Sequence, residues 1–168
     1  EYIAENGIVN DALFYLKKAA TNKSFRVNAN LFSAALKNKN IQSKLSDSIL
    51  TLCKNQKDPY HKSFLITALG NVPENWEFIS SQIFAENEWI IKTTSMEAFT
   101  NIRRLPEYKS LKVKNKNIDL IFLQQFQKAI EGNDPAVISL SAAVLREPAR
   151  DYKKLIHDFG FIEKALAK

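Results

Sequence analysis

The chain has 168 residues, of which 45% are hydrophobic and 25% charged, a composition typical of one globular domain or one short array of repeats. A single cysteine excludes an internal disulfide and a cysteine cage for a metal ion, and no apolar run approaches the roughly 18 residues of a membrane-spanning helix. The chain begins with Glu1 and has no basic-then-apolar signal region. We therefore expect either a fragment, as one region of a longer polypeptide, or a processed chain, and the sequence does not indicate its compartment.

The net charge of +6 is distributed unevenly along the chain. Seven basic residues and no acidic ones lie between Asp11 and Asp47, whereas the charged residues between Lys62 and Lys92 are all acidic. A second, mainly basic stretch follows from Lys92 to Lys116. A nucleic-acid groove needs continuous positive potential along the phosphates, which the acidic block interrupts unless it turns to another side of the molecule. The pattern favours a mildly basic surface and leaves nucleic-acid binding open.

Apolar residues recur with a helical period along nearly the whole chain, and strand signals are almost absent. Asp58-Pro59 and Asp134-Pro135 each place a capping carboxylate before a proline at the first helical position, which marks a helix start. Gly160 marks a helix end, because glycine takes the left-handed C-cap conformation without a Cβ clash. Short loops predict that consecutive helices form antiparallel hairpins. The predicted helices cover about 8–20, 24–37, 41–55, 59–71, 74–86, 88–105, 118–131 and 134–146, with a ninth before Gly160 and a short one after it.

The even-numbered predicted helices share a pattern in which an apolar pair follows an acidic residue after ten positions. The second helix carries a degraded copy, from Val27 to Ala34-Ala35. We expect the apolar pairs to be buried against partner helices, because they occupy one register of the repeat. The pattern joins Asp58 to Ala68-Leu69, Glu88 to Ala98-Phe99, and Asp134 to Val144-Leu145.

This pattern resembles the HEAT repeat, whose second helix typically opens Asp-Pro-x-Val-Arg and continues into Ala and Leu. The resemblance covers four helix pairs, at about 8–37, 41–71, 74–105 and 118–146, with a partial fifth at 149–168. It implies an all-α, right-handed α-α superhelix, a solenoid of about four to five HEAT-like hairpins. Residues 1–168 would then form a single repeat domain, with a concave surface built from the second helices.

The sequence departs from the HEAT pattern at several positions. His61 stands where the pattern has Val, and the basic position holds Lys62, Lys92 and then Ile138. In HEAT arrays this basic position and the acid of the turn often form a ladder between repeats, so the resemblance implies a structural role for both lysines. The extra stretch Pro106–Asn117 contains four lysines and one glutamate. We expect a solvated loop there, with a binding loop as the alternative.

Signals for catalysis or for a cofactor are absent from the sequence. With only four glycines, the chain has no glycine-rich loop that would hold a phosphate. His61 and His157 have no nearby Ser or Cys in an arrangement for nucleophilic catalysis, and we interpret them as surface or helix-start residues. Cys53 lies on an apolar helix face and is predicted to belong to the core. We therefore expect no catalytic residue, no metal site and no cofactor.

The resemblance implies a module for protein–protein interaction or scaffolding that is not itself an enzyme. In multidomain bacterial proteins, HEAT-like segments often accompany a separate catalytic domain, for example a prolyl isomerase. We expect a protein or peptide partner; the sequence does not indicate the oligomeric state. The candidate partner-binding residues, on the predicted concave face, are Tyr60, Lys62, Trp89, Lys92 and Arg103.

The alternative function is nucleic-acid binding, because some HEAT-like proteins are DNA glycosylases for alkylated bases. Those enzymes place an Asp between aromatic residues in a basic concave face. Here the position one turn after Trp89 holds Thr93, and the predicted second helices contain no Asp beyond their caps, which disfavours a glycosylase.

The two function classes predict different concave faces. A nucleic-acid binder needs Lys62, Lys92 and Arg103 on one face without acids. A scaffold needs a face of mixed charge with exposed aromatic or Met anchors. Glu88 and Glu97 accompany Lys92 and Arg103 on one predicted helix, which favours the scaffold.

Overall fold

In the computed structural model, every regular element of the described residues is helical, which confirms the predicted all-α class. None of these helices has the length and apolarity that crossing a membrane requires. The described residues are 9–22, 24–36, 38–85, 88–132, 134–135, 138–139 and 157. Their elements are α2 (Val9–Thr21), α3 (Phe25–Leu36), α4 (Lys39–Lys44), α5 (Ser46–Asn55), α6 (Pro59–Leu69), the 3-10 turn η1 (Pro73–Asn75), α7 (Trp76–Ala85), α8 (Trp89–Arg104), α9 (Tyr108–Lys114) and α10 (Ile118–Glu131).

The predicted helix positions are confirmed for most of this region, within one or two residues at each end. The Asp58 carboxylate caps α6 as expected, since its Oδ1 accepts a hydrogen bond of 2.9 Å from the His61 amide. Most of the predicted helix at 134–146, the last two predicted helices and the pair Val144-Leu145 lie outside the described residues.

The single helix predicted at 41–55 is instead two helices, α4 and α5, which meet at Leu45. Ile41, Leu45, Ile49 and Cys53 are all buried, so the four-residue spacing of apolar side chains continues through the break. Hydrophobic periodicity reports which side chains face the core and not whether the backbone is continuous. That is why the pattern did not reveal the break. The burial of Cys53 confirms its predicted place in the core.

The prediction of a solvated loop at Pro106–Asn117 is wrong, because this stretch contains α9. Tyr108 is buried, and its hydroxyl donates a hydrogen bond to Asp119 Oδ1 on α10. The Lys112 ammonium lies 2.5 Å from the other carboxylate oxygen of Asp119, which is itself buried. The buried Tyr108 ring and the Asp119 carboxylate, which Tyr108 and Lys112 share, therefore stabilise this lysine-rich segment as a helix. Its composition alone predicted a loop exposed to solvent.

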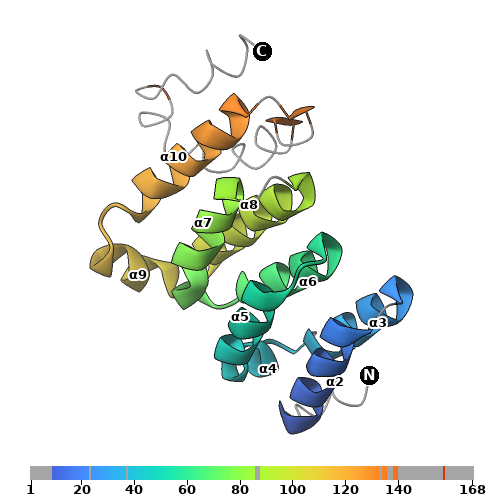
Figure 1. Cartoon of the computed structure of the whole chain (residues 1–168). Helices are drawn as coiled ribbons and strands as arrows, with labels where there is room; N and C mark the ends of the chain where they lie inside the picture. The colour runs from blue at the N-terminus through green and yellow to red at the C-terminus, as the bar shows by residue number, and fades with distance from the viewer. Residues whose placement is uncertain are drawn as a thin grey trace.

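The helices pair into hairpins, α2 with α3, α5 with α6 and α7 with α8, and each hairpin packs on the next (Figure 1). First helices meet where α2 contacts α5 and where α7 contacts α10. Second helices meet where α3 contacts α6 and where α6 contacts α8. The order along the chain is therefore also the order in space, from α2 at one end to α10 at the other.

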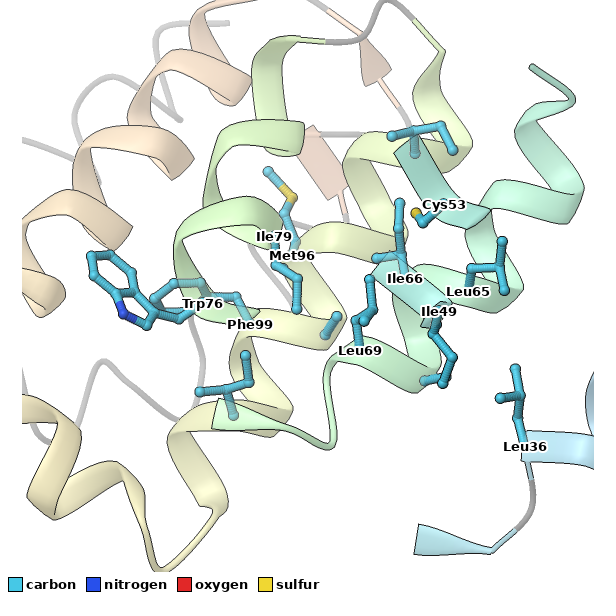
Figure 2. Close-up of a cluster of buried hydrophobic side chains, with 14 of the residues drawn as sticks. Leu36, Ile49, Cys53, Leu65, Ile66, Leu69, Trp76, Ile79, Met96 and Phe99 are labelled. Carbon is cyan, nitrogen blue, oxygen red and sulfur yellow. The ribbon is translucent and has the colours of Figure 1, made fainter. Parts of the chain in front are cut away.

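The core runs between these paired layers (Figure 2). Ala68-Leu69 on α6 and Ala98-Phe99 on α8 are buried, which confirms the predicted register for these two pairs. In α3, Val27, with which the degraded copy of the pattern begins, is 43% exposed. Among the α3 side chains whose burial the structure describes, Asn28 and Phe32 are fully buried, and Phe32 stacks on Phe64 of α6 at 5.8 Å between ring centroids. A polar residue, Asn28, therefore occupies a core position next to an exposed apolar one.

The α6–α8 contact is close because α6 ends in a glycine. A Cβ atom on Gly70 would lie 2.8 Å from Ala98 Cβ and 2.9 Å from Ala98 Cα. The Gly70 backbone has an ordinary right-handed conformation, with φ −65° and ψ −8°. Glycine is needed here for space and not for backbone freedom.

We expect Gly70→Ala to lower the free energy of unfolding by about 1–3 kcal/mol, since its new methyl group meets backbone that cannot move aside cheaply. Replacing glycine with alanine within a helix gains only about 0.5–1 kcal/mol, so the clash decides the sign. The measurement is a urea titration monitored by circular dichroism. Thr67→Ala on the exposed side of α6 is the control, expected to change stability by about 0.5 kcal/mol or less. A Gly70→Ala variant more stable than the wild type would contradict the close approach.

Phe99 offers a second test of the core, because it is fully buried and stacks on Phe122 of α10 at 4.4 Å between centroids. We expect Phe99→Ala to cost about 3–5 kcal/mol, the usual range for a buried aromatic reduced to a methyl group. A loss under about 1 kcal/mol in the same titration would show that α8 does not pack in this register.

Candidate functional site

Tyr60 and Trp89 are the two candidate site residues that present a large aromatic side chain to solvent, each 48% exposed. They lie in the first turns of α6 and α8, one register position apart, on neighbouring second helices. Trp76 also opens a helix, yet it is only 6% exposed and packs in the core. Of the two tryptophans that open helices, one is therefore a packing residue and the other is accessible.

The three basic candidates occupy different environments. Lys62 is 9% exposed, so little of its side chain is accessible to a partner. Lys92, at the same register of α8, is half-buried. Arg103 is in the last turn of α8, about 21 Å along the helix axis from Trp89, so these two residues do not share one site.

Arg103 takes part in the packing of α8 against α10. Its guanidinium carbon lies 5.2 Å from the centroid of Phe122, the ring that stacks on Phe99. A planar cation over an aromatic face is attracted by the ring quadrupole. The side chain therefore contributes to the helix contact, and less of it remains for an external ligand.

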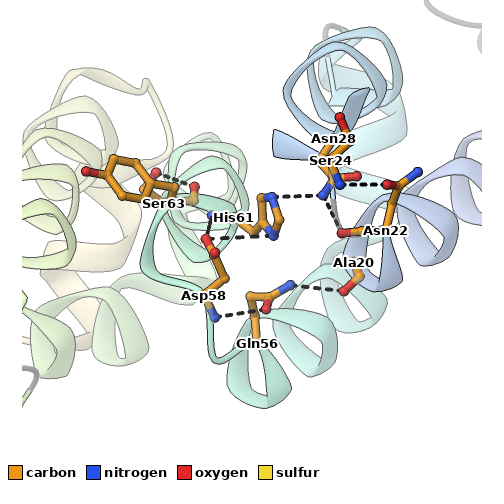
Figure 3. Close-up of polar contacts among 9 residues, drawn as sticks. Ala20, Asn22, Ser24, Asn28, Gln56, Asp58, His61 and Ser63 are labelled. Atoms are coloured by element: carbon orange, nitrogen blue, oxygen red, sulfur yellow. Dashed lines mark hydrogen bonds and ion pairs between the residues drawn. The ribbon is translucent and has the colours of Figure 1, made fainter. Parts of the chain in front are cut away.

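A buried polar link joins the first and second hairpins (Figure 3). Asn28 Nδ2 on α3 is 2.9 Å from His61 Nε2 on α6, and it also donates a hydrogen bond of 2.7 Å to the carbonyl of Asn22. Because an amide nitrogen can only donate, His61 Nε2 is the acceptor and the ring proton is on Nδ1. His61 is a helix-start residue as predicted, but it is buried at 7% exposure and not on the surface.

A second contact ties the turns of the same two hairpins together. Gln56 Nε2 donates to the carbonyl of Ala20 at 3.3 Å, while Gln56 Oε1 accepts from the Asp58 amide at 3.1 Å. The side chain therefore bridges the end of α2 and the start of α6 (Figure 3). Sequence reasoning missed this pair of links, since a lone Asn or Gln in a helical pattern carries no sign of its partner.

A third polar contact joins α6 to α8 at their C-terminal ends. Asn101 Nδ2 donates to Asn71 Oδ1 and to the Gly70 carbonyl, each at 2.9 Å. Asn71 and Asn101 are 30 residues apart, the same offset that separates Asp58 from Glu88. That equal offset was the available signal, and it would have identified the pair as equivalent positions of neighbouring repeats.

The exposed residues of α6 and α8 give their face a mixed character. Tyr60 and Thr67 are exposed on α6, and Trp89, Glu97 and Arg104 on α8. No group of three His, Cys, Asp or Glu side chains that could hold a metal ion occurs among the residues for which the structure gives positions. Comparison with protein families, curated proteins and solved structures finds no significant match to this chain.

We expect Asn28→Ala to lower the free energy of unfolding by about 1–3 kcal/mol, because it leaves His61 Nε2 and the Asn22 carbonyl without their donor. The matched control is Asn30→Ala, an exposed asparagine on the same helix, for which about 0.5 kcal/mol or less is expected. Urea titrations of both variants provide the measurement. Equal changes in the two would mean that the buried link does not stabilise the hairpin contact.

Proposed function

We propose that the chain is a non-catalytic protein-interaction module, a region of a longer polypeptide built as a right-handed superhelix of HEAT-like hairpins. Three features support the arrangement: the stacking of hairpins in chain order, the 30-residue offset between Asp58 and Glu88, and the same offset between Asn71 and Asn101. Each hairpin in such an array buries its apolar face only against its neighbours, which leaves a long surface of second helices for a partner.

The observation that carries the proposed function is the exposure of Tyr60 and Trp89 at matching ends of adjacent second helices. Large aromatic side chains of this kind are the usual anchors of protein interfaces, because they bury much apolar area at a small cost in side-chain entropy. Lys92 and Glu97 on α8 supply charges of both signs nearer to Trp89, as in the polar rim of an interface. A protein or peptide partner fits this surface.

Nucleic-acid binding at this surface is the weaker candidate. Lys62 is nearly buried, and the exposed acids Glu88 and Glu97 interrupt the positive potential along α8. A base-excision site has little support here, since Thr93, one turn after Trp89, is 9% exposed and carries no carboxylate. These features favour a protein partner over a nucleic acid at the second-helix face.

Photo-crosslinking from the position of Trp89 tests the proposed function. The variant Trp89→p-benzoylphenylalanine, irradiated in an extract of the source cells, should give discrete protein adducts that resist nuclease treatment. Adding Tyr60→Ala should weaken these adducts, because the two rings are proposed to anchor one partner. Mass spectrometry of the adducts identifies that partner.

The matched control for this experiment is Val113→p-benzoylphenylalanine, which places the same photo-reactive group on α9, where the side chain is 77% exposed. The control should not give the adducts seen from position 89. Identical adducts from both positions, or adducts that nuclease removes, would contradict a protein partner at this surface.

A further inference from the structure

The helix α2 exposes two adjacent aromatic side chains, of which Phe14 lies opposite the buried face of the helix and Tyr15 lies at the edge of that face. Ala12, Leu16 and Ala19 are its buried residues, whereas Phe14 is 55% exposed and Tyr15 39% exposed. The two rings touch edge to face, with centroids 5.4 Å apart. A phenylalanine exposed to this extent contributes little to the core that the described residues form.

Cations flank these rings on the same helix. Lys17 and Lys18 are both exposed, and they lie on either side of Phe14 by helical geometry. The Lys18 ammonium is 5.4 Å from the Phe14 ring centroid. Asp11 is the single acid of α2, and Arg26 adds an exposed cation at the start of α3. We call Phe14, Tyr15, Lys17 and Lys18 the α2 face.

The hairpin that carries the α2 face is held in place by the rest of the fold. Asn28 and Gln56 tie α3 and the end of α2 to the second hairpin through buried or partly buried hydrogen bonds. The backbone beneath the face is therefore already ordered, and a ligand would not have to fold the helix in order to bind.

We propose that the α2 face is a docking surface for single-stranded nucleic acid. Positive side chains supply sites for phosphates, and exposed rings supply stacking partners for unpaired bases. An acidic peptide without apolar side chains, such as polyglutamate, would use the cations but would leave the exposed rings without a role. A duplex would keep its bases stacked on one another and would also leave the rings unused.

This surface is separate from the one that carries the proposed function. The α2 face belongs to the first helix of the first hairpin, whereas Tyr60 and Trp89 are on the second helices of later hairpins. The inference does not depend on a protein partner at those residues. Each proposal can fail without the other.

The test is a titration of the full 168-residue chain against fluorescein-labelled oligothymidylate of about 20 nucleotides, followed by anisotropy at low and physiological salt. Phe14→Ala should weaken binding by about 5-fold or more, the loss of one stacked base, while Phe14→Trp should retain it. Lys17→Gln with Lys18→Gln should lower the slope of log affinity against log salt by about 1.4, the release expected from two single-strand phosphate contacts. Far-UV circular dichroism of each variant should match the wild type, since these side chains are exposed.

The matched control is Lys109→Gln with Lys114→Gln, which removes the same charge from exposed positions of α9. This pair should change the affinity by less than about 2-fold at physiological salt, where long-range attraction is screened. Equal losses from both lysine pairs would overturn the proposal, because general attraction to a chain of net charge +6 would then explain binding. The absence of binding, an unchanged Phe14→Ala variant, or tighter binding of polyglutamate would also overturn it.

Discussion

The close approach of α6 to α8 is the constraint on which the remaining packing depends. Gly70 allows the end of α6 to rest on the Ala98 backbone, which brings Leu69 and Phe99 into one buried cluster. Helix α6 also contacts α3 and α5, so the position of the first hairpin depends on that of α6. On the other side, Phe99 of α8 stacks on Phe122 of α10. Without that glycine the second helices would have to separate, and the contacts on both sides would shift with them.

Polar contacts between neighbouring hairpins fix their relative position, which apolar packing alone does not specify. Asn28 with His61 joins the first hairpin to the second, and Asn101 with Asn71 joins the second to the third. If a buried donor meets its acceptor at only one relative position of the two hairpins, every other position leaves that donor unpaired. Such a position is then less stable by the desolvation cost of the donor. The exposed rings of Tyr60 and Trp89 then face solvent from a framework whose register is already set, which suits an interface anchor.

Much of the helical layout could be predicted from the sequence, because burial of one face imposes the period that the apolar pairs and Cys53 follow. The α9 helix could not, since its folding depends on tertiary contacts, among them those of Tyr108 and Lys112 with Asp119 on α10. The exposure of individual apolar side chains could not be predicted from the sequence either. Val27 and Trp89 are apolar residues in helical patterns, and both reach solvent because of how the surrounding helices pack. The partner-binding role of Tyr60, Lys62, Trp89, Lys92 and Arg103 stays a prediction; the structure adds that the two aromatic residues reach solvent, while the accessibility of the basic residues depends on packing.

Amide hydrogen exchange of the whole chain, followed by mass spectrometry, tests most directly the claim that α6 and α8 form the centre of the packing. Amides that open only with global unfolding exchange last, so peptides from α6 and α8 should be the slowest and should lose protection together. Peptides from α9, which is short and anchored mainly by Tyr108, should exchange earlier. Exchange of α6 and α8 at clearly different rates, or no slower than that of α9, would contradict the account.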